Sequence, residues 1–266
     1  MTPFDALHRR GWVRFGHDPS VAEWARAARP VADGILADPQ ARETWMRCGG
    51  TWFAGVNIFP NDRNGRIPGR VPAVSGPALN AGLESLGLDE IALDTAQISV
   101  CFPGYPKPSE EESEANFRFR KNRDAAHIDG LLRDDARRRF LGEVHGFVLG
   151  LPLSDTPEGA APMVVWEGSH EIVRSAFRDR LGAIAPEDWS KEDLTDIYVT
   201  TRRRIFDECR RVTVHARPGE AYLIHRLALH GVAPWRSDGG AAPRMIAYFR
   251  PDPFPGSSPE WWLNRP

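Results

Sequence analysis

Residues 127–130 read His-Ile-Asp-Gly, and residues 230–231, about a hundred positions later, read His-Gly. Side chains on an extended segment alternate between two sides, so the imidazole of His127 and the carboxylate of Asp129 project in the same direction. A second imidazole from a distant strand would complete two nitrogens and one oxygen on one face of a metal. That arrangement leaves the opposite positions open and suits non-haem Fe(II). The motif alone decides little, because a chain with 8 histidines can contain a chance His-x-Asp.

The composition favours one large folded domain, and we expect a single domain over 1–266. An apolar fraction of 41% and nine tryptophans support a sizeable core and argue against disorder. The net charge of −2 gives no global basis for nucleic-acid binding.

The cysteines and the first residues indicate the compartment. Cys48, Cys101 and Cys209 are odd in number and widely spaced, which is typical of reduced thiols and not of a disulfide framework. The first residues contain no apolar signal-peptide core, and no apolar run is long enough to cross a bilayer. We therefore expect a soluble cytoplasmic protein that has no membrane partner.

The order of the segments predicts a mainly β fold with flanking helices. Residues 1–92 are helical and turn-rich, with a helical pattern over 4–47. Short segments separated by Gly, Pro and Asp turns then predict a sandwich or jelly roll over 93–250. The predicted strands are 95–102, 117–123, 143–153, 161–166, 212–216, 221–228 and 245–249. A helical insertion over 169–210 interrupts them. Its second part, 187–210, is charged on most faces, so we expect a lid or a contact in a homo-oligomer.

Three further segments accompany the His-x-Asp pair. Residues 161–170 form an apolar strand that ends in Gly-Ser-His, 219–231 form a strand that delivers His230 at its end, and 243–251 form a strand that opens on Arg244. In this order and spacing, the set resembles the phytanoyl-CoA dioxygenase-like family of Fe(II)/2-oxoglutarate-dependent oxygenases. The likeness runs from the leading helix to the last strand and so covers most of the chain.

The resemblance implies a double-stranded β-helix (a cupin-like jelly roll) with iron held in its mouth by His127, Asp129 and His230. It assigns Arg244 to the distal carboxylate of the co-substrate 2-oxoglutarate, which a planar guanidinium can bind through two hydrogen bonds. Gln97, on the strand before the His-x-Asp, is a further candidate for contact with the co-substrate. The spacing from His230 to Arg244 is longer than the family pattern, and residues 237–242 resemble a loop extension that absorbs the excess.

The identity of the carboxylate ligand bears on the reaction. Related halogenases replace it with a small residue that makes room for halide, whereas Asp129 completes the ligand set here. The resemblance therefore implies oxygenation, usually hydroxylation, of a small organic substrate. In that reaction O2 is consumed and 2-oxoglutarate is converted to succinate and CO2.

Alternatives to these assignments remain at the level of single residues. His127 and Asp129 could form a surface hydrogen-bonded pair, and Arg244 could extend from a strand end toward solvent. His225 rivals His230 as a ligand, although their odd spacing places them on opposite faces of a regular strand and His-Gly favours His230. His145 and His170 are interpreted as structural residues, with His170 in a turn near the mouth.

Two other functions fit the same architecture. One is a cupin-like metalloenzyme that does not use 2-oxoglutarate. The other is a jelly roll that binds a small molecule without catalysis, although such a protein has no physical reason to retain three convergent ligands.

Overall fold

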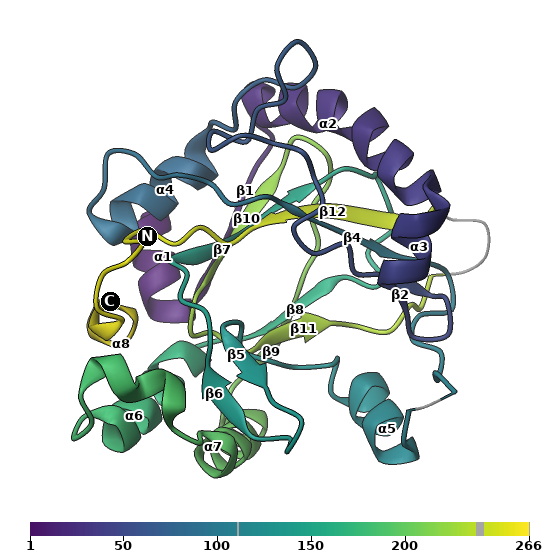
Figure 1. The fold of residues 1–266 in the computed structure, drawn as a ribbon. Coiled ribbons are helices and arrows are strands. Elements are labelled where there is room, and N and C mark those ends of the chain that lie inside the picture. Colours follow the sequence, from purple (N-terminus) through teal and green to yellow (C-terminus); the bar gives the residue numbers. More distant parts are fainter. Residues whose placement is uncertain (111, 238–241, 266) are drawn as a thin grey trace.

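A computed structural model describes residues 1–110, 112–237 and 242–265 (Figure 1). Seven strands form one antiparallel sheet in the order β1-β10-β7-β12-β4-β3-β2, and three form a second sheet in the order β11-β8-β9. Strands β5 and β6 pair as a separate hairpin. The strands are β1 (Trp12–Phe15), β2 (Met46–Arg47), β3 (Trp52–Phe53), β4 (Gln97–Cys101), β5 (Leu131–Arg133), β6 (Arg139–Leu141), β7 (Phe147–Pro152), β8 (Met163–Trp166), β9 (Arg211–Val214), β10 (Ala221–His225), β11 (His230–Val232) and β12 (Arg244–Phe249).

Helices surround the two sheets (Figure 1). They are α1 (Pro3–Arg10), α2 (Pro19–Ala37), α3 (Pro39–Trp45), α4 (Pro77–Leu86), α5 (Glu114–Asn122), α6 (Ser169–Leu181), α7 (Thr195–Glu208) and α8 (Glu260–Asn264), with a 3-10 helix, η1 (Pro186–Lys191). Among the described residues, no helix is both long and apolar enough to cross a bilayer.

The alternation along β12 shows how the sheets face each other. Ile246 and Tyr248 pack in one buried cluster with Met163 and Val165 of β8, so this side of β12 faces the small sheet. The intervening side chains of β12, including Phe249, pack in another cluster with α2. Period-two alternation therefore gives the large sheet an inner face toward the small sheet and an outer face under α2.

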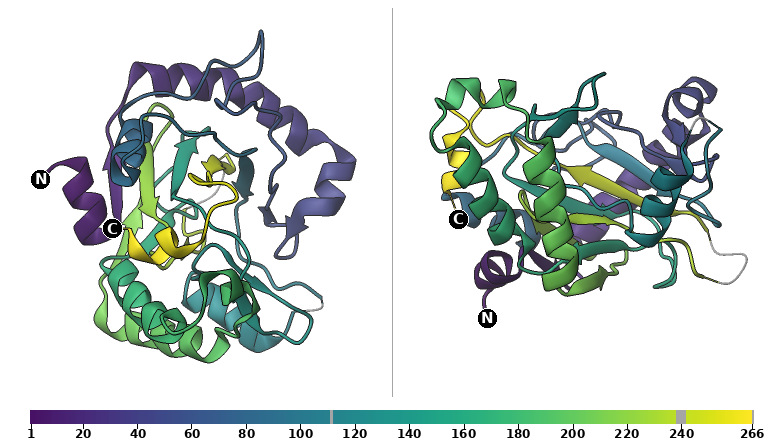
Figure 2. Two further views of the ribbon diagram at one scale, coloured as in Figure 1. Left: turned by 60° about the vertical axis from the view of Figure 1, so that its left-hand side comes forward. Right: turned by 90° about the horizontal axis from the view of Figure 1, so that it is seen from below.

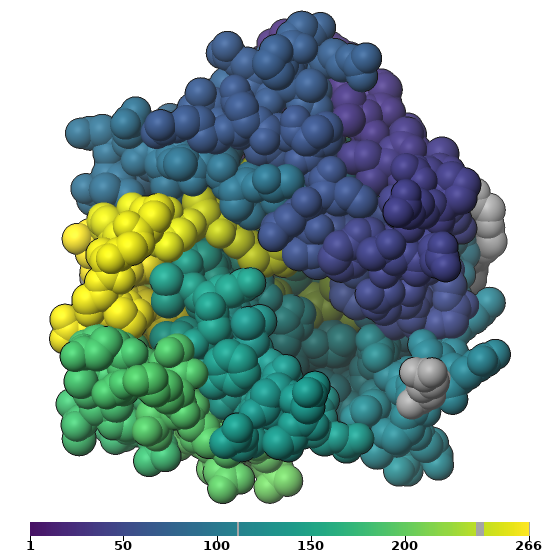
Figure 3. All heavy atoms as spheres, in the orientation of Figure 1, coloured from purple at the N-terminus to yellow at the C-terminus, as the bar shows by residue number. Residues whose placement is uncertain are grey.

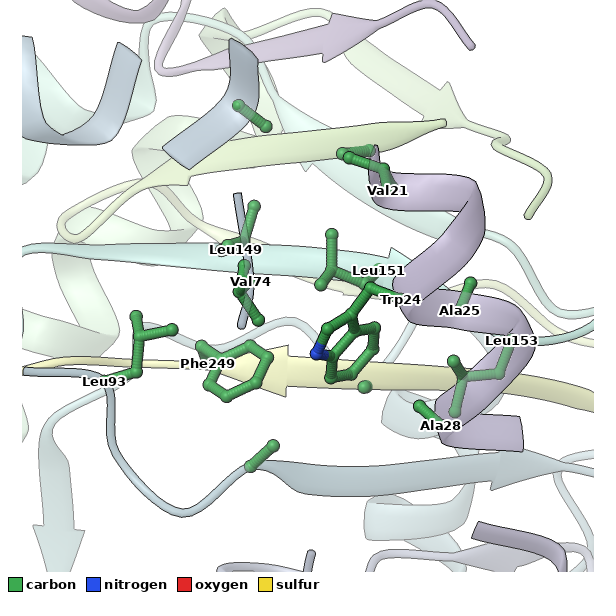
Figure 4. Close-up of a cluster of buried hydrophobic side chains, with 14 of the residues drawn as sticks. Val21, Trp24, Ala25, Ala28, Val74, Leu93, Leu149, Leu151, Leu153 and Phe249 are labelled. Carbon is green, nitrogen blue, oxygen red and sulfur yellow. The ribbon is translucent and has the colours of Figure 1, made fainter. Parts of the chain in front are cut away.

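Helix α2 closes the outer face of the large sheet (Figure 4). The Trp24 ring lies 5.8 Å from the Phe249 ring, and Trp24 is 1% exposed. Its indole Nε1 donates to the carbonyl of Gly65 at 2.9 Å, so the buried polar atom is satisfied. The helical pattern predicted for this region is confirmed over α2. However, the predicted helical range 4–47 also contains β1, because the left-handed Gly11 ends α1 and β1 then pairs with β10.

Helices α6 and α7 lie on the outer side of the small sheet, and α8 packs beside α6 in the same buried cluster (Figures 1 and 2). Tyr198, Thr201 and Ile205 of α7 are buried on one helical face, at steps of three and four residues. The segment 187–210, predicted to be a lid or a contact in a homo-oligomer, therefore also contributes to the core. The many charged residues around α7 obscured a narrow buried stripe.

Two local predictions were also wrong. Residues 117–122 belong to helix α5, for which Arg123 is the C-cap. Ser113 Oγ caps its N-terminus by accepting from Asn116 N, although Phe117 and Phe119 alternate like strand residues. The segment 219–231 is two strands, β10 and β11, joined by a tight turn. The hairpin of β5 and β6 had no sequence prediction, because each strand has only three residues and is too short to show a periodic pattern.

Candidate metal centre

His127 and His230 lie opposite each other on paired backbone. His127 N donates to His230 O at 2.8 Å, and His230 N donates to His127 O at 3.0 Å. His230 is also paired through β11 with Val165 of β8. The small sheet thus fixes the position of His230, and the backbone pairing with His230 fixes the position of His127.

The glycines of the two motifs allow this close approach. A Cβ on Gly231 would lie 2.1 Å from the Asp124 carbonyl oxygen, and a Cβ on Gly130 would lie 2.5 Å from the Glu143 carbonyl oxygen. Gly130 also has φ of 87°, which residues with side chains rarely adopt. The His-Gly and Asp-Gly sequences therefore follow from the packing around the site.

The three side chains point their donor atoms toward one another. One ligand atom from each of His127, Asp129 and His230 lies within 4.8 Å of the others. His127 Nε2 is 3.2 Å from Asp129 Oδ1, and His230 Nε2 is 3.4 Å from Asp129 Oδ2. Ligands bound at about 2.1 Å and at right angles would be roughly 3 Å apart, so the spacing fits a metal ion.

Backbone carbonyls set the tautomer of both imidazoles. His127 Nδ1 lies 3.0 Å from Ala125 O, and His230 Nδ1 lies 2.9 Å from Ala228 O. A carbonyl oxygen only accepts, so each Nδ1 carries a proton, and each Nε2, which faces Asp129, is the nitrogen that could bind a metal once it is unprotonated. This outer hydrogen bond is typical of metal-binding histidines.

Arg250 is a charged neighbour that the sequence interpretation missed. Its Nε donates to Asp129 Oδ2 at 2.6 Å, and its Nη1 donates to Gln97 Oε1 at 2.7 Å. Gln97 Nε2 donates in turn to Ala54 O at 2.7 Å. Both polar ends of Gln97 are therefore used, and Gln97 acts on the site through Arg250. Arg244 and Arg250 are an even number of residues apart, so their side chains lie on the same side of an extended segment. This spacing could have identified Arg250 from the sequence.

The electrostatics of the group follow from these contacts. Burial raises the pKa of Asp129, but the charges of Arg250 and His230 outweigh burial and hold this pKa well below its ordinary value. Burial lowers the pKa of His127, and the hydrogen bond and charge of Asp129 outweigh it, so the net shift is upward. The site therefore presents an ionised carboxylate, which is the form that binds a cation.

Arg244 lies deeper, at the start of β12, and is 4% exposed. Its Nη2 donates to the Tyr248 hydroxyl oxygen at 3.0 Å, and Tyr222 donates to the same oxygen at 2.8 Å. Within the described residues, Arg244 Nη1 is buried and has no hydrogen-bond partner. Tyr248 accepts twice, so its own hydroxyl proton can be donated elsewhere. The unsatisfied Nη1 and the Tyr248 proton fit a carboxylate. The loop extension predicted at 237–242 falls mostly outside the described residues.

The other histidines of the sequence interpretation lie elsewhere. His225 ends β10 and its Nε2 lies 3.0 Å from Arg174 Nη2, so it is on a different strand from His230 and not on the opposite face of the same one. His170 begins α6, is fully buried and bonds to His8 O, so its placement near the mouth was wrong. His145 is buried and lines the cavity described next.

A cavity of about 720 Å³ opens onto the three ligand candidates. This volume is in the range of small-molecule sites. The space-filling view shows a hollow between the blue N-terminal segments and the teal segments (Figure 3). The walls come from β4, β12, the β5–β6 hairpin and the segment around Val56. Arg244 does not line the cavity, whereas Tyr248 does.

The similarity of this chain to known proteins lies in its fold. No protein-family model and no curated protein matches the sequence. Among solved structures, the non-heme alpha ketoglutarate dependent carbocyclase SnoK from nogalamycin biosynthesis matches with a TM-score of 0.50 at 15% identity, covering 94% of this chain and 83% of SnoK. EctD from S. alaskensis with bound Fe scores 0.46 at 14% identity, covering 98% and 81%. AviO1 from Streptomyces viridochromogenes Tue57 scores 0.44 at 13% identity, covering 97% and 96%. The likeness to SnoK shows a shared fold.

Proposed function

We propose that this chain is an Fe(II)- and 2-oxoglutarate-dependent oxygenase that hydroxylates a small organic substrate. The observation that carries the proposal is the convergence of two Nε2 atoms and one carboxylate within 4.8 Å, at the wall of a cavity. Two nitrogens and one oxygen on one face leave positions open for co-substrate and O2. We infer that the two facing sheets are a double-stranded β-helix and that the chain belongs with the phytanoyl-CoA dioxygenase-like oxygenases.

Each residue has a defined part in this proposal. His127, Asp129 and His230 hold the iron, which together with 2-oxoglutarate supplies the oxidative chemistry that no side chain provides. The carbonyls of Ala125 and Ala228 keep both histidines in the metal-binding tautomer. These groups are held on paired backbone, so little reorganisation is needed when the metal binds.

The co-substrate is held by its far carboxylate. Arg244 Nη1 and the Tyr248 hydroxyl donate to this carboxylate, and the guanidinium charge strengthens the hydrogen bonds. Arg250 occupies Asp129 Oδ2 and so restricts how the carboxylate can turn toward the metal. Gln97 positions Arg250.

A cupin-like metalloenzyme without 2-oxoglutarate is the second candidate. It is favoured by the position of Arg244, which lies behind Tyr248 and does not line the cavity. The two candidates differ in one property, which is whether 2-oxoglutarate binds to the metal.

An anaerobic titration of the Fe(II)-loaded protein with 2-oxoglutarate tests the proposal. We expect a visible metal-to-ligand charge-transfer band that is absent in His127→Ala. The band should require about 10- to 100-fold more 2-oxoglutarate in Arg244→Ala, because an arginine–carboxylate pair is lost. Arg178→Ala, an exposed arginine on α6, is the matched control and should behave like the wild type.

Other outcomes would change the assignment. A metallated protein without the band would favour the cupin-like enzyme. A protein that binds neither Fe(II) nor another divalent metal at these residues would favour a non-catalytic binding protein.

A further inference from the structure

Two exposed apolar side chains converge at the cavity. Three large hydrophobic residues in the described part of the chain are exposed: Met1 at 72%, Val56 at 42% and Leu132 at 42%. Val56 and Leu132 both line the cavity, from segments far apart in the sequence. A single exposed hydrophobic residue needs no explanation, whereas two that meet at a binding cavity indicate an apolar surface on the ligand.

The polar part of the same wall is acidic. Asp94, Glu143 and Asp252 line the cavity, and none of the three forms an ion pair with another described residue. Burial raises the pKa of Asp94 to about 6, although the backbone N–H and the charge of Arg250 act in the opposite direction. At neutral pH the Asp94 carboxylate is still ionised.

The two arginines that line this cavity do not neutralise the acidic wall. Arg250 is committed to Asp129 and Gln97. The guanidinium carbon of Arg139 lies 4.6 Å from the centre of the Tyr198 ring in a cation–π contact, and Arg139 also lines the cavity without an ion pair to a described carboxylate. Among the described residues, the carboxylates of Asp94 and Asp252 each accept a backbone N–H, and neither they nor Glu143 form an ion pair with an arginine side chain.

His145 provides a second, independent sign of a ligand. It is 3% exposed, lines the cavity and lies against the glycine that follows Asp129, where a Cβ on Gly130 would be 3.8 Å from its Cε1. Its Nε2 is buried and has no hydrogen-bond partner among residues 1–110, 112–237 and 242–265. Buried polar atoms in native proteins nearly always have partners, so this imidazole fits a ligand group.

We infer that the substrate is a compact amine, with an apolar ring or chain against Val56 and Leu132 and a protonated nitrogen directed to the acidic wall of Asp94 and Glu143. This inference rests on the proposed function for the reaction that follows binding. The acidic wall also discriminates, because the carboxylates of Asp94 and Glu143 would repel an anionic competitor. The neutral imidazole of His145 adds an uncharged hydrogen-bonding partner.

The test compares three probes of one shape on the metal-free protein. Cyclohexylmethylamine, cyclohexylmethanol and cyclohexanecarboxylate are titrated by ligand-observed NMR in the presence of a chelator. We expect the amine to bind at least 10-fold more tightly than the carboxylate and more tightly than the alcohol. Leu132→Ser should weaken the amine and the alcohol by similar factors, because both lose the same apolar contact.

The acidic wall is tested with isosteric variants. Asp94→Asn keeps the acceptor for Arg250 N, which donates to Asp94 Oδ1 at 2.7 Å, and should weaken amine binding about 10-fold. Asp155→Asn, an exposed carboxylate outside the cavity with 68% of its side chain accessible, should change nothing.

Equal or tighter binding of the carboxylate would overturn the inference, as would amine binding that is unchanged in an Asp94→Asn, Glu143→Gln double variant. The metal is absent from these measurements. An amine preference found in a protein that fails the 2-oxoglutarate titration would therefore retain this inference and reject the proposed function.

Discussion

The Asp129 carboxylate is shared between three basic side chains. His127 and His230 approach it at 3.2 and 3.4 Å, and Arg250 donates to it at 2.6 Å. Its side chain is 13% exposed and that of Arg250 is 24% exposed, so the ion pair is largely out of water. Removing one member of such a pair leaves the other charge without compensation.

Asp129→Ala should therefore destabilise the metal-free protein by about 3 kcal/mol, whereas His127→Ala should cost about 1 kcal/mol or less. The His127 side chain is 44% exposed, so its loss leaves little unsatisfied. Urea unfolding at pH 7.5 with a chelator measures both. Equal losses would show that the Asp129–Arg250 pair does not contribute to stability.

A second residue-scale prediction concerns acid. Burial lowers the pKa of His145 from 6.5 to about 4, so between these values the unfolded chain binds a proton that the native protein does not. Stability from this group is complete above about pH 6.5 and is lost as the pH falls toward 4. Asp94 acts in the opposite sense, because its native pKa of about 6 exceeds its ordinary 3.8.

Comparison with His145→Gln isolates the histidine, since Asp94 is common to both proteins. From pH 7 to pH 5, the wild type should lose about 2 kcal/mol more unfolding free energy than the variant. Urea titrations at both pH values measure the difference. A parallel decline in the two proteins would mean that His145 is protonated in the native state at pH 5.

At the scale of the elements, strand β7 controls the position of the groups that we propose to hold the co-substrate. Gly150 leaves the space that the Tyr222 ring occupies, and a Cβ there would lie 2.2 Å from Tyr222 Cε2. Tyr222 donates to Tyr248, which accepts from Arg244. Because Gly150 of β7 has no side chain, the Tyr222 ring can take the position from which it bonds to Tyr248, and Tyr248 in turn bonds to Arg244.

Gly150→Ala should displace Tyr222, destabilise the protein by about 1–3 kcal/mol and weaken 2-oxoglutarate binding several-fold through Arg244. Urea unfolding and the charge-transfer titration measure the two effects. Gly34→Ala in α2 is the control, because no atom lies within 4 Å of its Cβ position. That variant should be neutral or slightly more stable. Unchanged 2-oxoglutarate affinity in Gly150→Ala would separate the tyrosines from the co-substrate.

At the scale of the whole molecule, the candidate metal site joins separate parts of the chain. His127 and Asp129 precede the β5–β6 hairpin, and His230 begins β11 of the small sheet. Arg250 comes directly from the end of β12 in the large sheet. A metal bound here should therefore stabilise the folded chain as one unit.

Fe(II) or another divalent metal at 100 times its dissociation constant should add about 2.7 kcal/mol to the unfolding free energy, since the unfolded chain does not assemble the site. His230→Ala should lose this increment. His17→Ala, which removes an exposed histidine outside the site, should retain it. Anaerobic thermal unfolding with and without metal provides the measurement, and equal metal stabilisation in all three proteins would place the metal elsewhere.

The sequence by itself determined the segments in which local pattern and burial agree. The helix around Trp24 and the strand that holds Phe249 are predicted by apolar patterns within a few neighbouring residues. The motif glycines are likewise visible in the sequence next to the histidine and aspartate that they follow. The His-x-Asp spacing likewise predicted two side chains on one side of the chain. The structure brings His230 to them, while their role as metal ligands stays a prediction.

Only the tertiary structure decided which distant groups meet. Residues 117–122 alternate like a strand but form α5, because a capping serine outweighs two phenylalanines. Arg250 reaches Asp129 across 121 positions, and Asp94, Glu143 and Val56 meet around one cavity. Contacts between sheets depend on register and strand order, which arise from the packing of the whole chain and leave no periodic signal in any one segment.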